Sequence, residues 1–271
     1  MAGYAADGTK RWELEGTQAM LHGDAVTIQH PHAIGYEPTR SVSLTASLAH
    51  VQQASHRILL EHNVTIHTSD GLWLETPTMY WVPDTDEVVT DQPASLETDR
   101  MLLYGREVIA HTHLKTAVFQ HDIELVISQR SNAQWSGMMS PGASGRAQTS
   151  GAPAAANADA HVTITCDGPL TLDSDRQIAT FEHHVHVQDR QGDLYSDKLV
   201  AYLHKTTRTI AYAEASGHVR IQQGPHTAHG ERAVYEPARS KITLLGAPSL
   251  LVSPHEQSPG VGGSLGTVVT R

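Results

Sequence analysis

The chain has 271 residues, 39% of them hydrophobic and 18% charged, which is consistent with one large or two ordinary domains and a thin core. A formal net charge of −10 argues against a nucleic-acid partner, because phosphate neutralisation needs clustered Lys and Arg. The single cysteine, Cys166, excludes an internal disulfide and a zinc site built from cysteines. No apolar run approaches the roughly 20 residues that a membrane-spanning helix needs.

In the first half, alternating apolar and polar residues predict a half-buried strand over 57–67, because successive strand side chains point to opposite faces. A turn is expected at 69–71 and a second strand over 72–82. Residues 42–53 could form a helix, and we favour strand and turn. The apolar face of the strand over 57–67 consists of Ile58, Leu60, Val64 and Ile66, and its polar face of Glu61, Asn63, Thr65 and His67.

The second half carries the same period-two pattern. Gly, Asp and Pro separate its short apolar runs, as turn residues do. Many short strands of this kind predict an all-β fold. The predicted strands of this half include residues 162–166, 185–187, 217–221 and 241–245.

Two segments lack any periodicity and are rich in small, polar, Gly and Pro residues, which is typical of flexible chain. The first is a predicted linker over 131–160, and the second is a predicted disordered tail over 255–271. We therefore expect one β module at 1–130 and another at 161–254.

The second half also contains an internal repeat. Copies separated by 32 to 34 residues indicate a supersecondary unit that stacks on its own copies. The matching pairs are 194–202 with 227–235, 209–215 with 241–247, and His184-Val185 with His218-Val219, with a fainter copy that begins at Asn63-Val64.

At these residues the first half resembles the LptC-type proteins of the OstA-like lipopolysaccharide-transport family. The resemblance spans roughly Trp12 to Ile127. It rests on DGTKRWELEGTQA at 7–19, LTA at 44–46, Asn63-Val64, DGL at 70–72, VTDQP at 89–93, and Gly105 with Ala110.

The second half is similar to LptA over about Val162 to Val252. One departure is His184, which stands before Val185 where the family usually has Asn. The matching residues are TCDGPL at 165–170, ATF at 179–181, DKL at 197–199, ASGHV at 215–219, Gly230, Tyr235 and LLGAP at 244–248.

The resemblance implies two open β-jelly-roll modules of antiparallel strands in tandem. Each would hold lipid acyl chains in an apolar groove between two sheets, while the sugar portion stays in water. The groove-lining residues that we predict are Ile58, Leu60, Val64, Ile66, Leu74, Leu96, Leu103 and Leu125 in the first module, and Ile164, Leu172, Phe181, Val185, Val187, Leu199, Val219, Ile221, Ile242 and Leu244 in the second.

The resemblance also implies a set of partners in the periplasm. These are lipopolysaccharide, the inner-membrane lipopolysaccharide ABC transporter and the outer-membrane translocon, with head-to-tail self-association left open. LptC-type members carry an N-terminal membrane helix, so we expect an inner-membrane tether to lie in a segment absent from this chain. The predicted docking edge, where a partner strand would be added, is Ser249, Leu250, Leu251 and Val252.

Catalysis and metal binding find little support in the sequence. GGSLG at 262–266 matches a nucleophile-elbow pattern, but no strand precedes it and no helix follows. The pairs His30/His32, His111/His113 and His184/His186 each supply two imidazoles without a third ligand. We therefore expect no enzyme activity, no cofactor and no metal.

Two kinds of binding or structural protein remain. The first carries lipopolysaccharide as part of a bridge from the inner to the outer membrane. The second is a structural β-solenoid or adhesin-type scaffold without a lipid ligand, which the repeat also permits. A scaffold would fill its interior with side chains, whereas a carrier would keep an open apolar cleft.

Overall fold

The structure is a computed structural model that describes residues 1–5, 7–36, 40–52, 54–55, 57–82, 84–111, 115–129, 160–189, 192–204, 210–236, 239 and 241–252. The predicted linker up to residue 159 and the predicted tail lie outside these residues. The described part of the chain forms twenty strands, and their pairings are antiparallel. None of its helices is long and apolar enough to span a membrane.

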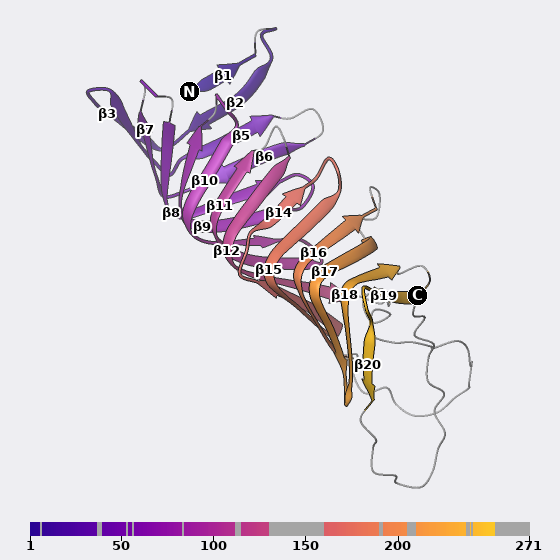
Figure 1. The fold of residues 1–271 in the computed structure, drawn as a ribbon. Coiled ribbons are helices and arrows are strands. Elements are labelled where there is room, and N and C mark those ends of the chain that lie inside the picture. The colour runs from indigo at the N-terminus through magenta and orange to yellow at the C-terminus, as the bar shows by residue number, and fades with distance from the viewer. Residues whose placement is uncertain are drawn as a thin grey trace, which may run out of the picture. The chain divides into compact units, whose positions relative to one another are not determined.

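The chain divides into two compact units. Unit 1 contains Met1–Leu125 together with Gly168–Asp175. Its strands β8 to β11 pair in chain order, and Figure 1 shows them side by side. The strands of unit 1 are β1 (Ala2–Tyr4), β2 (Lys10–Glu15), β3 (Gln18–His22), β4 (Ala25–Gln29), β5 (His32–Tyr36), β6 (Ser41–Thr45), β7 (Leu48–Gln52), β8 (Arg57–Thr68), β9 (Trp73–Val82), β10 (Glu87–Glu97), β11 (Met101–His111), β14 (Leu170–Asp173) and most of β12 (Thr116–Gln129).

Unit 2 contains Val126–Asp167 and Arg176–Arg271. Its long strands β15 to β18 also pair in chain order. The strands of unit 2 are β13 (Ala160–Cys166), β15 (Ile178–Gln188), β16 (Asp193–Leu203), β17 (Ile210–Gln223), β18 (His226–Glu236), β19 (Lys241–Leu245), β20 (Ser249–Val252) and the end of β12.

In each unit one long strand pairs with two short strands, so that the sheet divides into two arms. In unit 1, β8 pairs with β7 through residues 57–61 and with β6 through residues 65–68. One arm continues through β5 and β2 to β1, and the other through β4 to β3. In unit 2, β18 pairs with β20 through residues 226–229 and with β19 through residues 232–236.

The long strands bend where a residue with positive φ interrupts the ladder. Asn63 has φ 56°, His184 52° and His218 45°, and the pairing register shifts at each of them. Such bulges bend a strand and increase its twist. Asn, Asp and His adopt this left-handed conformation more readily than other non-glycine residues. One strand can therefore contribute residues to both arms.

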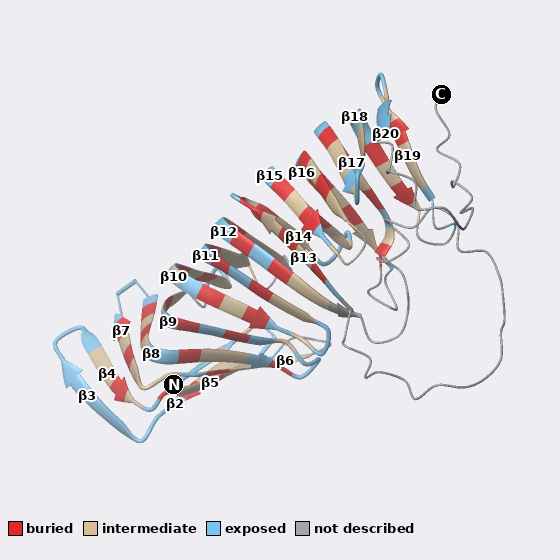
Figure 2. Cartoon of the chain, turned by 90° about the horizontal axis from the view of Figure 1, so that it is seen from below, coloured by how far each residue is buried: buried red, intermediate tan, exposed pale blue. Residues whose placement is uncertain are grey.

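Burial follows the alternation expected from the sequence. Buried and exposed or half-buried bands alternate along β9, β10 and β11 in Figure 2. The stretch with helical potential forms the two strands β6 and β7, which confirms the preference for strands. The all-β prediction is likewise confirmed, and the predicted strand over 241–245 coincides with β19.

Candidate functional site

In unit 1 the register of the strands aligns apolar side chains into rows on the inner face, which we define as the side of each unit that carries the buried side chains. Trp12 of β2 and Trp81 of β9 meet edge to face, with their ring centroids 5.6 Å apart. One row crosses seven strands through Leu14, Ala33, Leu44, Ile66, Leu74, Leu96 and Leu103, and all but the half-buried Ile66 are buried.

A second row of unit 1 runs out to solvent at β3. Its central member Ile58 is 2% exposed, whereas its last member Leu21 is 68% exposed. Strand β3 is exposed along its whole length, as Figure 2 shows. Among the described residues β3 pairs with β4 alone, so its other edge is open. The row consists of Leu21, Val26, Val51, Ile58, Trp81, Val88 and Ala110.

Unit 2 is built in the same way. One of its rows decreases in burial toward the last strand: Leu194 is fully buried, whereas Leu250 of β20 is 53% exposed. This row consists of Ile164, Val187, Leu194, Ile221, Ala228 and Leu250. Two further rows are Phe181, Leu199, Ala215, Ala233, Leu244 and Ala179, Ala201, Ala213, Tyr235, Ile242.

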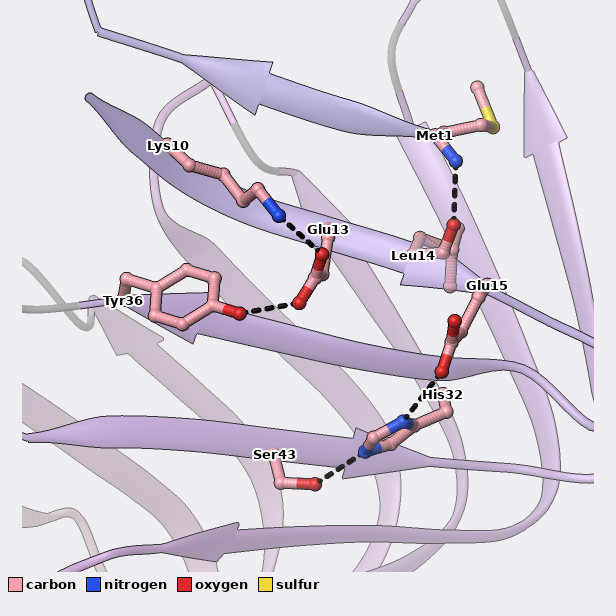
Figure 3. Close-up of polar contacts among 8 residues, drawn as sticks. All are labelled: Met1, Lys10, Glu13, Leu14, Glu15, His32, Tyr36 and Ser43. Carbon is pink, nitrogen blue, oxygen red and sulfur yellow. Dashed lines mark hydrogen bonds and ion pairs between the residues drawn. The ribbon is translucent and has the colours of Figure 1, made fainter. Parts of the chain in front are cut away.

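The outer face is polar, as the alternation requires. In unit 1, Glu13 of β2 accepts hydrogen bonds from Lys10 Nζ at 2.7 Å and from the Tyr36 hydroxyl (Figure 3). These bonds, that of Lys10 first, lower the pKa of the Glu13 carboxyl. Leu14, next to Glu13, belongs to the buried row. One strand thus presents a charged face to water and an apolar face to the interior.

The outer face of unit 2 also carries polar side chains, one residue along each strand from the apolar row. His186 stacks on Tyr195 with ring centroids 4.4 Å apart, and the Arg220 guanidinium lies 4.1 Å from the centre of the same ring. These residues stand opposite one another across β15, β16 and β17. This outer row thus carries polar and aromatic side chains, whereas the row one residue away is apolar.

The groove residues predicted from the sequence are all buried or half-buried. The first-module residues of β8, β9, β10 and β11 lie in unit 1, and most of the second-module residues lie in the rows of unit 2. Leu172 differs, because it lies in β14 of unit 1, opposite Ala117. The half-buried members are Ile66, Leu172, Ile221 and Ile242.

Two family models match parts of the chain. Residues 1–124 match the family described as lipopolysaccharide-assembly, LptC-related, and residues 164–259 match the family described as LptA/(LptD N-terminal domain) LPS transport protein. The chain joins an LptC-related module to an LptA-type module. No curated protein matches the chain.

The chain is therefore a lipopolysaccharide-transport protein of the periplasmic bridge type, with the antiparallel β architecture expected of OstA-like jelly rolls. The two families are transport proteins and are not known as enzymes. Nothing in the fold or the comparisons favours the adhesin-type scaffold over the transport function.

The bends explain why His can stand before Val185 where the LptA pattern usually has Asn. The residue before the buried Val is Asn63 in the LptC-related module but His184 and His218 in the LptA-type module. All three have positive φ, a conformation that both Asn and His tolerate. The recurring residue-Val pair was visible in the sequence as a mark of the repeat. The bulge that it encodes was missed.

The bends of the LptA-type module carry ion pairs that the sequence did not predict. His184 Nδ1 donates to Asp167 Oδ2 at 2.7 Å, and His218 Nδ1 donates to Asp197 Oδ2 at 2.7 Å. The hydrogen bond from Asp167 raises the pKa of His184, and Asp197 adds a smaller electrostatic contribution. Gly217 permits the second pair, because a Cβ there would lie 2.3 Å from Asp197 Oδ2.

A hollow of about 850 Å³ lies at the corresponding bend of the LptC-related module. Its lining includes the exposed Tyr104 and Arg106 of β11 and Asn63 and Thr65 of β8. The sequence did not indicate it, because its lining comes from β8 to β12. In the described part of the chain, no group of three or more His, Cys, Asp or Glu residues could hold a metal ion. The GGSLG motif lies outside that part.

Proposed function

We propose that this chain carries lipopolysaccharide by holding its acyl chains against the inner face of each unit, with the sugar portion in water. Burying each methylene of an acyl chain is worth about 0.8 kcal/mol, so a lipid with several chains needs an apolar surface throughout its passage. The observation that carries the proposal is the series of apolar rows that cross most strands of each unit. Each unit has a row that ends on an exposed leucine, Leu21 in unit 1 and Leu250 in unit 2.

Acyl chains would enter where the lining is least packed. Ile66 and Ile221 are half-buried, and each has a buried neighbour in its row, Leu74 and Leu194 respectively. A ligand that displaces a half-buried side chain disturbs fewer packed contacts than one that displaces a buried side chain. Within the interior of the rows, these two positions are therefore the ones at which an acyl chain would displace a side chain most easily.

Site-specific photo-crosslinking tests the proposal. Photo-reactive residues at Ile66 and Ile221 should capture lipopolysaccharide in cells that produce it. Matched controls at Thr65 and Arg220, one residue away and on the outer face, should not. Equal capture at both sets of positions would contradict an inner-face site.

The open strands support a proposal for the partners. Leu250 and Leu251 are exposed, and among the described strands β20 pairs with β18 alone. An unpaired strand edge of this kind accepts a further strand through backbone hydrogen bonds. The docking edge, Ser249 to Val252, would join the outer-membrane translocon or a second copy. The open edge of β3 would face the inner-membrane transporter, to which a segment outside this chain would tether the protein.

Replacing Leu250 by Pro tests the docking edge. Proline removes a backbone donor and fixes φ, so pull-down of the translocon should be lost. The thermal melting temperature should change little, because β20 has one neighbour among the described strands. A folded Leu250→Pro variant that still binds the translocon would overturn the assignment.

A further inference from the structure

The hollow at the bend of the LptC-related module lies over a gap in the pairing of β9 with β10. Within the described strands, residues 76–79 of β9 are not paired with residues 90–94 of β10, although the two strands pair on either side of the gap. Each strand carries a proline there, Pro77 or Pro93, which has no backbone N–H to donate to a ladder. The sheet therefore parts at this point, and both prolines line the hollow.

Hydroxyl groups hold the two sides of the gap in place. The Thr76 hydroxyl donates to the Pro93 carbonyl across the gap at 3.1 Å. It also lies 3.2 Å from the Thr90 hydroxyl, which accepts a hydrogen bond from the Gln92 amide at 3.1 Å. Thr76 and Thr90 are both buried. The hollow is thus preformed, and a ligand would not have to open it.

The hollow opens on the outer face of unit 1, away from the apolar rows. Ser95 of β10 and Tyr104 of β11 stand opposite each other, and both line it. The neighbouring residues along these strands, Leu96 and Leu103, are buried in a row of the inner face. Tyr104 is 45% exposed. A ligand in the hollow would therefore not compete with an acyl chain on the inner face.

The lining offers an aromatic ring beside hydrogen-bond donors and acceptors. In the described part of the chain, the Tyr104 ring stacks on no other ring and has no cation over it. Arg106 Nη1 lies 3.7 Å from Asp122 Oδ2, which is too long for a hydrogen bond, and both side chains are exposed. Asn63 adds an amide that can donate and accept. One ligand could therefore meet a ring face, a guanidinium, a carboxylate and an amide.

The balance of charge narrows the class of ligand. Apart from the titratable His62, the charged side chains of the lining are Arg106, Glu75 and Asp122. One cation against two carboxylates disfavours an anion such as phosphate. A bare metal ion is disfavoured too, because no group of three or more His, Cys, Asp or Glu residues in the described ranges could hold one.

The size of the hollow suits a ligand of more than one ring. Its volume of about 850 Å³ lies within the roughly 300–1,000 Å³ that is usual for small-molecule sites. An uncharged sugar matches both the size and the lining. Its hydroxyls donate and accept hydrogen bonds, and the C–H groups of its ring can pack on an aromatic side chain.

We propose that the hollow formed by β8 to β12 of unit 1 binds an uncharged saccharide. One sugar ring would lie on Tyr104, with its hydroxyls bonded to Arg106, Asp122 and Asn63. The saccharide would come from the sugar portion of lipopolysaccharide or from the glycan of the cell wall. This inference goes beyond lipid carriage, and it stands whether or not the inner face binds lipid.

Saturation-transfer NMR on the full chain tests the site with two uncharged probes. The first is a neutral oligosaccharide from the sugar portion of lipopolysaccharide. The second is N,N′-diacetylchitobiose, which contains an N-acetylated sugar like that of the cell wall. Neither probe has an acyl chain, so the inner face does not contribute to its binding. At least one should receive saturation from the protein, and the probe that does so identifies the source.

Variants of Tyr104 locate the bound sugar. Tyr104→Ala should weaken binding about tenfold, as the loss of an aromatic anchor typically does. Tyr104→Phe keeps the ring face and should retain most of the binding. The matched control is Tyr212→Ala, which removes an exposed tyrosine of unit 2 and should leave binding unchanged. Thermal melting confirms that each variant is folded.

A further variant keeps the proposal testable if Tyr104→Ala is unstable. Arg106→Gln removes a guanidinium whose side chain is 55% exposed, and it should also weaken binding. Saturation transfer to neither probe would overturn the proposal. Binding that is unchanged in folded Tyr104→Ala would overturn it as well, because the sugar would then lie elsewhere. Displacement of the sugar by inorganic phosphate would assign the hollow to an anion instead.

Discussion

The packed middle and the open edge of unit 2 are built from the same row of side chains. Leu194 in the middle is 0% exposed and Leu250 at the edge is 53% exposed, although both point toward the inner face. Leu194 has a paired strand on each side, whereas β20 has one described neighbour. The presence of a neighbouring strand therefore decides whether an inward leucine becomes core or docking surface.

The largest expected effect is the difference in stability between truncating Leu194 and truncating Leu250. Leu194→Ala should lower the free energy of unfolding by about 2 to 5 kcal/mol, because it removes buried contacts and leaves a cavity. Leu250→Ala should change it by less than about 0.5 kcal/mol, since the side chain is exposed. Urea denaturation of both variants measures the difference. Similar losses would mean that the edge is packed in the free protein.

The bend in each long strand offers a second test of how the middle and the edge differ. It allows one strand to contribute residues to both arms of the sheet. His218→Val should cost about 1 to 2 kcal/mol, since a β-branched residue is disfavoured at the positive φ of 45°. His218→Asn is the matched control, because it also loses the ion pair with Asp197 but keeps a residue that tolerates this conformation. Thermal melting should separate the two variants, and equal melting temperatures would argue against strain at the bend.

The smallest effect is expected at the exposed ion pair of β15. Asp167→Asn should lower the pKa of His184 toward its ordinary value of 6.5, because the hydrogen bond to Asp167 is the main cause of the raised value. Asp197→Asn should lower it less. Titration of the His184 ring protons by NMR measures both changes.

The same pair sets the direction of a small pH effect on stability. The folded-state pKa of His184 is raised, so the stabilisation is fully present below pH 6.5 and is lost as the pH rises through the folded value. Wild type and Asp167→Asn should therefore differ slightly in melting temperature at pH 5.5 and not at pH 9. A difference that grows with pH would contradict this assignment.

The sequence by itself determined the strands and their faces. Residues 241–245 form β19 as predicted, and Ile58, Leu60 and Val64 are buried as their alternation required. The physical reason is local: successive Cβ atoms of a strand point to opposite sides, and the family motifs follow the same strands. Even the bends left a trace, in the Asn or His that precedes a buried Val.

Only the tertiary structure decided which strands became neighbours. The sequence assigned Leu172 to the second module, and the pairing of β14 with β12 placed it in unit 1. Likewise Ile164 and Leu250 share one row, but only the first is buried, because burial depends on strands distant in the chain. Period-two patterning states which way a side chain points. It does not state what lies opposite that side chain, and that contact decides between core, lipid-binding surface and docking edge.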